Sequence, residues 1–347
     1  LNGESNRHQS WRMKNPRLIS SPSDLLIAIP FLLGFTPSNS IVVVSIKDQI
    51  VEMTMRSDFP PEIKYSEVAD ELLAQLGAHK AQEILLVAYL PPELEFDAHF
   101  LKELFIDLNK SIPVRDFVAV SGDRWRSLSC VDDECCPIQG RALPEISTSL
   151  LAVEEVAAGN PMPLQSEDEL IASIAFTPSP WDEGFTEAID QHWSYLQSLG
   201  QKESSKAGVA SLLKLISEFS AKGYAQDRQA VVEVFAALAD IQVRDFAIGA
   251  HGQELLLTHW SMWRWLLRMA PEANVAPVSS IFAILSYERG DGALAHRALD
   301  RALANDSQYS LALLLRRTFS AGWPPEAFSK MRAELHPKIR DEILGAA

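Results

Sequence analysis

The stretch IVVVSIKDQIVEMTMR, residues 41–56, sets the architecture of the first half of the chain. Two runs rich in β-branched and apolar residues, IVVVSI and IVEMTMR, flank the polar triplet Lys47-Asp48-Gln49. Two such runs separated by a few polar residues are typical of an antiparallel hairpin. We therefore predict paired strands over residues 41–46 and 50–56.

Downstream of this hairpin, helical and strand patterns alternate. Apolar residues recur at helical spacing over residues 65–79 and again over 96–109. The continuous apolar runs ILLVAYL (84–90) and FVAVSG (117–122) are typical of strands that are covered on both faces. The order strand, strand, helix, strand, helix, strand predicts an α/β fold, with a mixed sheet and flanking helices.

Upstream of the hairpin, SPSDLLIAIPFLLGF (21–35) predicts a helix. Ser23 is the expected N-cap, and Gly34 stands where the helix should stop. Pro30 is expected to kink the helix or to end its first segment.

The strand patterns stop after about residue 145, where AAGNPMPLQSEDE is rich in turn formers and acids. From Phe185 onward the pattern is helical throughout. The predicted domains are a disordered leader (1–16), an α/β domain with a cysteine-containing loop (17–150), a linker (151–182) and a helical domain (183–340).

The end of the helical domain carries small residues at helical spacing, Ala293, Ala295, Ala298 and Ala302, after a Gly-Asp-Gly turn. Small residues let two helices approach closely, as they do in tetratricopeptide hairpins. We therefore predict an all-α, helical-hairpin (TPR-like) domain. An ordinary helical bundle and a protein-binding solenoid both remain open, since about three repeats are needed for a stable solenoid.

Net charge and composition restrict the partners. The chain has 46 acidic and 31 basic residues, which give a formal net charge of −15. A surface this acidic repels phosphate backbones and anionic lipid, so we expect neither nucleic acid nor membrane as a partner. Three cysteines cannot form a closed disulfide framework and favour a reducing compartment, so a cytoplasmic location is predicted.

Signature motifs of the common enzyme classes are missing from the sequence. None of GxxxxGK[ST], GxGxxG, GxSxG, HExxH or a paired CxxC occurs. His259 lies in THWSMWRWLLRM, where Trp260, Trp263 and Leu267 form an apolar stripe that we assign to the core.

All three cysteines lie in SGDRWRSLSCVDDECCP, residues 121–137. Buried structural thiols, a metal site, a redox pair and a nucleophile all remain open for Cys130, Cys135 and Cys136. Zinc is not favoured, because adjacent cysteines point in different directions and a fourth ligand is not evident. A reactive thiolate would need a lowered pKa, for which Arg124 and Arg126 are candidate neighbours.

The stretches SPSDLLIAIPFLLGFTPSNSIVVV, MRSDFP, GDRWRSLSC…CCPIQG, LLAVEEVAAG and GDGALAHRALDRALANDSQYSLALLL together resemble the actinobacterial domain-of-unknown-function 4192 family. The resemblance covers nearly all of residues 17–330. It implies a fold outline and a bacterial cytoplasmic setting but no reaction, since the family has no assigned activity. The polar positions that its pattern singles out are Asp24, Ser40, Arg56, Asp58, Arg124, Trp125, Cys130, Cys135 and Cys136.

These positions suggest a ligand site at one edge of the sheet. Ligands of open α/β sheets bind at the carboxyl ends of strands, and two arginines beside a tryptophan suit an anionic or planar ligand. The candidate ligand-binding residues are Asp24, Arg56, Asp58, Arg124 and Trp125. The competing interpretation is structural, with Asp24 as a capping residue and Arg56 and Asp58 as an ion pair.

Our leading hypothesis is a binding or adaptor protein, with a pocket for a small anionic ligand in the α/β domain and a protein partner on the helical domain. The alternative is a small-molecule hydrolase or transferase that uses Asp24 or Asp58 as a base, or a cysteine as nucleophile. In the cysteine stretch we expect Arg124 to face the pocket and residues 131–134 to form an exposed acidic turn. Pro137 should hold Cys136 extended and so separate its side chain from that of Cys135.

Overall fold

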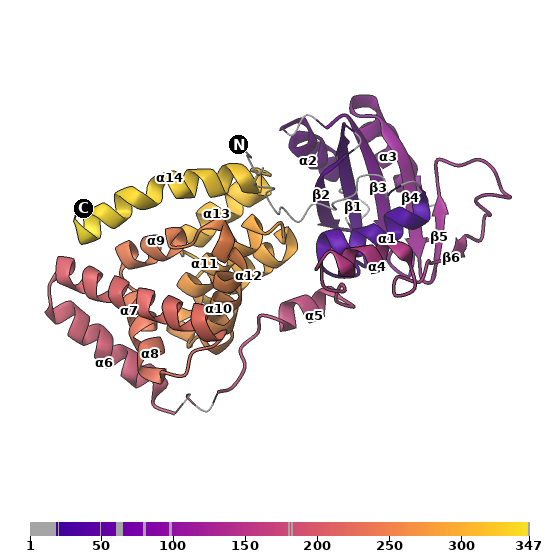
Figure 1. The fold of residues 1–347 in the computed structure, drawn as a ribbon. Coiled ribbons are helices and arrows are strands. Elements are labelled where there is room, and N and C mark those ends of the chain that lie inside the picture. Colours follow the sequence, from indigo (N-terminus) through magenta and orange to yellow (C-terminus); the bar gives the residue numbers. More distant parts are fainter. Residues whose placement is uncertain are drawn as a thin grey trace, which may run out of the picture. The chain divides into compact units, whose positions relative to one another are not determined.

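In the part of the chain that the structure describes, six strands form one mixed sheet in the order β2-β1-β3-β4-β5-β6 (Figure 1). The strands are β1 (Ser40–Lys47), β2 (Ile50–Asp58), β3 (Glu83–Tyr89), β4 (Val114–Ser121), β5 (Arg124–Ser127) and β6 (Arg141–Ala142). Neighbouring strands pair antiparallel except β3 and β4, which run parallel. The predicted mixed sheet is confirmed.

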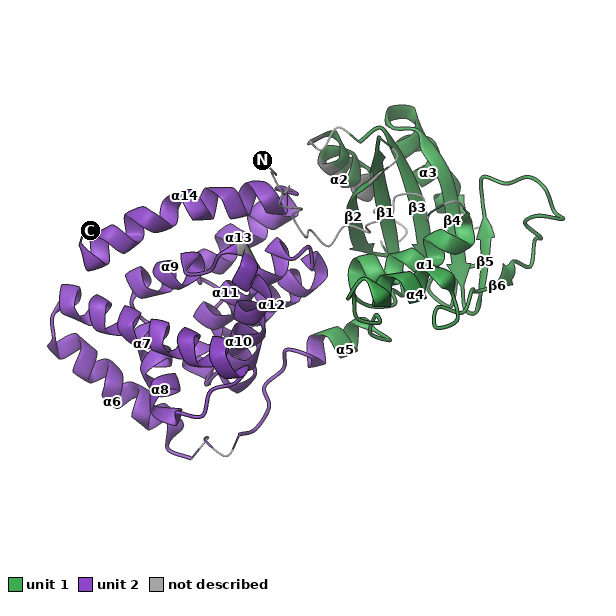
Figure 2. Cartoon of the chain, viewed as in Figure 1, with its two compact units in different colours: residues 1–170 green, residues 171–347 purple. Residues whose placement is uncertain are grey.

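The structure is a computed structural model that describes residues 19, 21–48, 50–59, 65–78, 81–96, 99–179, 181 and 183–345. The predicted leader, residues 1–16, lies outside the described residues. The chain divides into two compact units, residues 1–170 and 171–347 (Figure 2). The boundary between them falls within the predicted linker, residues 151–182.

The predicted hairpin is formed by β1 and β2, with Ser40 opposite Asp58. Asp48 takes a positive φ of 50° in the connecting turn, a conformation that Asp tolerates better than most residues. The other edge of β1 pairs with β3, where Ser40 lies opposite Tyr89. Because β1 is paired on both edges, it lies inside the sheet, and residues 41–44 are fully buried.

Helices cover both faces of the sheet (Figure 1). The helices α2 (Tyr65–Ala78) and α3 (His99–Ser111) pack on one face. The core on this face contains Ile41, Val43, Leu72, Leu76, Leu86, Leu101, Leu104 and Phe117. The alternate strand residues, such as Val42 and Val118, point to the opposite face and are also fully buried. That face is covered by α1 (Pro22–Leu33) and α4 (Leu150–Ala157) (Figure 1).

The first helix begins two residues earlier than predicted. The hydroxyl of Ser21, and not that of Ser23, accepts a backbone N–H of the first turn at 3.1 Å. Pro22 then stands in the first turn, where the missing N–H of proline costs nothing. Pro30 lies inside the helix, which continues until Gly34 ends it with a φ of 82°.

Part of the predicted linker is structured. Leu151 of α4 packs against Ile27 and Ala28 of α1, so this helix belongs to the α/β unit. The short helix α5 (Glu167–Ala172) spans the boundary of the two units. The turn-forming composition of residues 158–166 correctly predicted irregular backbone there. The helices on either side, α4 and α5, were not predicted, because the whole of residues 151–182 was assigned to the linker.

The second unit is helical, as predicted (Figure 1). Its described helices are α6 (Phe185–Ser198), α7 (Gln201–Lys222), α8 (Arg228–Ala237), α9 (Ile241–Gly249), the 3-10 turn η3 (Gln253–Leu255), α10 (Leu256–Met269), the 3-10 turn η4 (Glu272–Asn274), α11 (Val275–Glu288), α12 (Gly292–Asn305), α13 (Ser310–Ser320) and α14 (Pro325–Leu344). The helices α9 and α10 are separated by irregular backbone at residues 250–252 and the 3-10 turn η3, although the sequence pattern is helical throughout.

The centre of the helical unit is α11, which is buried along its whole length. The small residues Ala295, Ala298 and Ala302 of α12 are fully buried, which permits close packing against α11. Within the described part of the chain, no helix combines the length and the apolar character that crossing a bilayer requires.

A charged cluster is buried beside α11. The carboxylate of Glu288 accepts two hydrogen bonds from Arg332, at 2.6 and 3.1 Å, and lies 3.4 Å from Nε2 of His251. His259 lies beside this cluster, with its ring 5.4 Å from that of His251, and neither of its nitrogens has a hydrogen-bond partner among the described residues. Burial, together with the charges of His251 and Arg332, lowers the pKa of His259 to about 4.

Acid should destabilise the protein through His259. The pKa of His259 falls from 6.5 in the unfolded chain to about 4 in the folded one. Below pH 6.5 the unfolded chain therefore takes up a proton that the folded protein does not, so the free energy of unfolding decreases until the pH reaches about 4. We expect His259→Phe to remove up to about 3 kcal/mol of this acid-dependent loss. Urea unfolding between pH 7 and 4 measures it, and identical pH profiles for the variant and the unaltered protein would contradict the prediction.

Candidate functional site

The ends of five described strands meet at one end of the sheet. Ser40 starts β1 and lies opposite both Asp58, at the end of β2, and Tyr89, at the end of β3. Ser121 ends β4 and lies opposite Arg124, the first residue of β5. The predicted site residues on the strands therefore share one end of the sheet.

Arg56 and Arg124 are nevertheless too far apart to bind one small ligand. Their strands are four positions apart in the sheet, which corresponds to roughly 19 Å at about 4.8 Å per strand. Arg56 is already neutralised, because Asp58 lies 3.0 Å and Glu167 2.9 Å from its guanidinium. Its guanidinium also lies 5.7 Å from the ring of Phe35. These contacts agree with the competing structural interpretation, in which Arg56 and Asp58 form an ion pair.

Arg124 and Trp125 hold the cysteine-containing loop. The guanidinium of Arg124 donates to the carbonyls of Gly140, at 2.6 Å, and Gln139, at 3.4 Å. Trp125 is buried and lies opposite Arg141 of β6, so the loop returns to the strand from which it left. The guanidinium that made Arg124 a candidate for ligand binding thus donates its hydrogen bonds to the backbone of its own loop.

Asp24 lies in the first turn of α1, where its backbone N–H donates to the N-cap Ser21. A carboxylate in the first turn stabilises the positive end of the helix dipole. Sequence reasoning missed Tyr89, whose buried hydroxyl, like that of Ser40, has no hydrogen-bond partner among the described residues. Burial raises the pKa of Tyr89, so this phenol stays protonated.

The cysteine loop folds around Asp132. Its side chain accepts the backbone N–H groups of Glu134, at 2.9 Å, and Cys135, at 3.4 Å. Its carbonyl accepts the N–H of Cys136 at 2.7 Å, which closes one helical turn. Residues 131–134 are exposed, as predicted for this acidic segment.

This turn brings the three thiols together. The sulfur atoms of Cys130, Cys135 and Cys136 all lie within 4.8 Å of one another, and those of Cys135 and Cys136 are 4.0 Å apart. Cys136 is buried and Cys135 is exposed to solvent. Their sulfur atoms do not diverge, however, because the backbone is turned at Cys135 and Cys136 where we predicted an extended chain.

The thiol cluster does not favour nucleophilic catalysis by its buried member. Burial, the neighbouring thiol of Cys130 and that of Cys135 raise the pKa of Cys136 to about 11. A thiol with a raised pKa is protonated at neutral pH and is a poor nucleophile. Among the described residues no hydrogen bond pairs a cysteine with a histidine, which is one of the groups that activate a thiolate.

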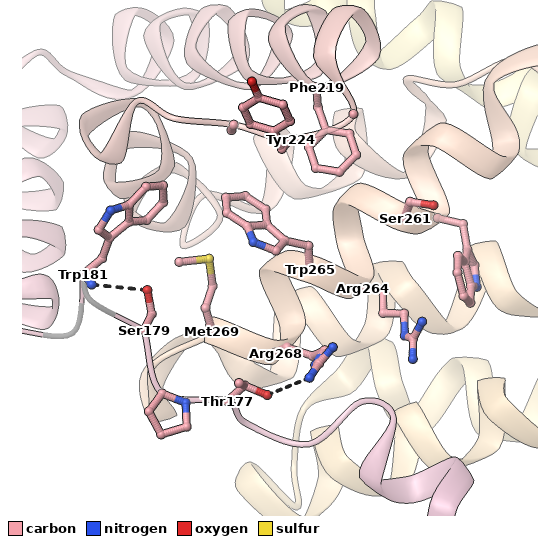
Figure 3. Close-up of a pocket in the computed structure, with 14 residues that line it drawn as sticks. Thr177, Ser179, Trp181, Phe219, Tyr224, Ser261, Arg264, Trp265, Arg268 and Met269 are labelled. Carbon is pink, nitrogen blue, oxygen red and sulfur yellow. Dashed lines mark hydrogen bonds between the residues drawn. The ribbon is translucent and has the colours of Figure 1, made fainter. Parts of the chain in front are cut away.

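A groove of about 690 Å³ lies in the helical unit, and sequence reasoning missed it (Figure 3). The aromatic side chains that line it are Trp181, Phe219, Tyr224, Trp260 and Trp265. Trp181 and Trp265 contact each other edge to face, with ring centres 6.0 Å apart. The segment before α6 forms one wall, because Arg268 donates to the hydroxyl of Thr177 at 3.0 Å and accepts the N–H of Thr177 through its carbonyl.

The groove is cationic. Arg264 and Arg268 line it, on the side away from Tyr224 (Figure 3). Neither forms an ion pair with a carboxylate among the described residues. Burial, together with the charges of Arg268 and Arg289, lowers the pKa of Arg264. Arg289 lies 4.1 Å from the ring centre of Trp260, but its charge is offset by Asp291, whose carboxylate lies 3.5 Å from the guanidinium.

Two faces of the helix α10 matter here, and the sequence analysis identified only the buried one. Trp263 and Leu267 are buried, as the predicted apolar stripe requires. Trp260, Arg264 and Arg268 follow each other at four-residue spacing on the adjacent face, about 100° around the helix, and line the groove. Trp260 also packs against Phe282 of α11, with ring centres 5.5 Å apart, so it belongs both to the core, as predicted, and to the wall of the groove.

The described fold and sites define a two-unit protein, with a three-thiol loop on its α/β unit and an aromatic, cationic groove in its helical unit. A family model described as "Domain of unknown function (DUF4192)" matches residues 22–326. This match spans most of the chain, so the chain belongs to that family. No curated protein and no solved structure matches it.

The cysteine loop depends on Gly140. This residue has a φ of +73°, and an added Cβ would lie 2.9 Å from the ring of Phe96 and 3.0 Å from the carbonyl oxygen of Trp125. Gly122 has a similar φ of +58° but nothing within 4 Å. We expect Gly140→Ala to cost about 2–3 kcal/mol of unfolding free energy and Gly122→Ala about 1 kcal/mol. Urea unfolding measures both, and equal losses would show that the loop is not packed as described.

Proposed function

We propose that this protein is a binding protein whose helical unit takes up a small organic anion with a planar, apolar ring. The observation that carries the proposal is the groove, in which aromatic walls stand beside two arginines that form no ion pair with a described carboxylate. Its volume of about 690 Å³ lies within the range of roughly 300–1,000 Å³ that is usual for small-molecule sites.

The composition of the groove matches such a ligand. Flat aromatic walls such as Trp181 and Trp265 stack on a planar ring, and stacking of this kind is favourable beyond the burial of area. The guanidinium groups of Arg264 and Arg268 provide several fixed donors for a carboxylate, sulfonate or phosphate. Because the chain as a whole carries a net charge of −15, this local positive field would attract an anion that the rest of the surface repels.

The α/β unit supports this function less well. An anionic ligand there would compete with the carboxylates of Glu167 and Asp58 for Arg56. In the groove the acceptors are neutral, the Ser173 carbonyl for Arg264 and the Thr177 hydroxyl for Arg268. The proposal therefore keeps the small anionic ligand of the sequence-based hypothesis but assigns it to the helical unit.

A cytoplasmic setting accompanies the proposal, because three neighbouring cysteines in the free thiol form persist best in a reducing compartment. The acidic surface continues to argue against nucleic-acid and membrane partners. The proposal requires no protein partner.

Binding of 8-anilinonaphthalene-1-sulfonate to the native protein tests the proposal, because this dye combines a fused aromatic ring with a sulfonate. Arg268→Gln should weaken dye binding about tenfold, as expected for the loss of about 1.4 kcal/mol from one charged contact. The neutral analogue N-phenyl-1-naphthylamine should lose less than about twofold, because it makes no such contact. Fluorescence titration measures both.

Two further variants make the test specific. Trp181→Ala should weaken both dyes, because it removes a wall of the groove. Arg317→Gln removes the same charge from an exposed position on α13 and should leave both affinities unchanged. If Arg268→Gln and Arg317→Gln weaken the sulfonate dye equally, or if the folded protein does not bind it, the proposal is wrong.

A further inference from the structure

The three thiols of the α/β unit form a cluster of metal-ligand type that is separate from the groove of the helical unit. Their sulfur atoms lie within 4.8 Å of one another and come from two positions along the loop, Cys130 on one side and the pair Cys135 and Cys136 on the other. Three thiolates at the usual zinc–sulfur distance of about 2.3 Å stand about 3.8 Å apart in a tetrahedral site. The 4.0 Å between Cys135 and Cys136 is already close to that value.

We propose that Cys130, Cys135 and Cys136 bind one zinc ion through three thiolates and leave the fourth coordination position open to solvent. Three sulfur ligands select a soft or borderline metal over magnesium or calcium, which prefer oxygen. Cys135 is exposed and Cys130 half-buried, so the ion has an approach from solvent. Zinc sites with three protein ligands keep water or substrate in the fourth position.

The loop is already arranged to hold such an ion. Asp132 fixes the turn that carries Cys135 and Cys136, through hydrogen bonds from the backbone N–H groups of Glu134, Cys135 and Cys136. Arg124 fixes the far end of the loop at Gly140. Because the backbone is fixed at both places, binding costs little ordering entropy.

The charges around the cluster also favour a cation. Asp132, Asp133 and Glu134 lie in the exposed turn between the two halves of the ligand set. Arg126 opposes them only in part, since its guanidinium lies 3.7 Å from the exposed carboxylate of Asp133. Cys136, which is buried, supplies the inner ligand against the core.

The competing use of the same sulfur atoms is a disulfide, which would consume two of the ligands. The two uses give different results on one sample of the full-length protein. After reduction and removal of the reductant, the zinc form holds one metal ion per chain and has the mass of three thiols. The disulfide form regenerates a mass lower by two hydrogens in air and holds no metal.

Competition with a chromophoric zinc chelator tests the proposal on the reduced protein. Cys135→Ser is the lead variant, because this side chain is exposed and its change should not disturb folding. We expect it to weaken zinc binding at least roughly a hundredfold, since loss of an outer-shell partner alone costs about 10- to 100-fold. Cys130→Ser should do the same.

Val131→Ala is the matched control, since this fully exposed side chain lies in the same loop and offers no ligand atom. It should bind one zinc ion with unchanged affinity, and circular-dichroism melts verify that each variant is folded. If the reduced protein binds zinc no more tightly than Cys135→Ser, or takes up less than one ion per chain, the three-thiol site is refuted.

Discussion

The α/β unit depends on the complete enclosure of β1. This strand is hydrogen-bonded along both edges, by β2 and β3, and residues 41–44 are buried on both faces. Backbone groups removed from water need partners on both sides, and apolar side chains on both faces need covering layers. The run IVVVSI meets both requirements at once. The flanking helices and the alignment of five strand ends at one end of the sheet follow from it.

A comparable constraint shapes the helical unit. The helix α10 buries His259, Trp263 and Leu267 against the interior, and the helical period then directs Trp260 and Arg264 to the adjacent face, about 100° around the helix. Two arginines on one face of a helix repel each other and are ordinarily offset by nearby acids. Here they are accompanied by tryptophans and by neutral acceptors, the carbonyl of Ser173 and the hydroxyl of Thr177, and no described carboxylate forms an ion pair with either.

The sequence was informative wherever the hydrophobic period is strong. The hairpin follows from its β-branched runs, the buried strand over 84–90 from a continuous apolar run, and the all-α second half from helical spacing. Residue type alone was a poor guide to the site. Arg124 has the chemistry of a ligand contact, but its target is the carbonyl of Gly140, which only the folded loop brings within reach. The convergence of Cys135 and Cys136 likewise depends on a turn closed by Asp132, and no spacing rule encodes that turn.

The groove was missed because its residues come from segments about 90 positions apart, Thr177 and Arg268 among them.

The two units thus carry different chemistry, a cluster of soft thiols in one and a cationic aromatic groove in the other. The proposal that the helical unit binds organic anions is tested most directly by a crystal of the full-length protein soaked with 4-iodobenzoate. The iodine gives an anomalous signal that identifies the site without assumptions. We predict an anomalous peak in the groove beside Trp181 and Trp265, with the carboxylate on Arg264 or Arg268. Peaks only elsewhere on the protein, with the groove filled by ordered water, would contradict the proposal.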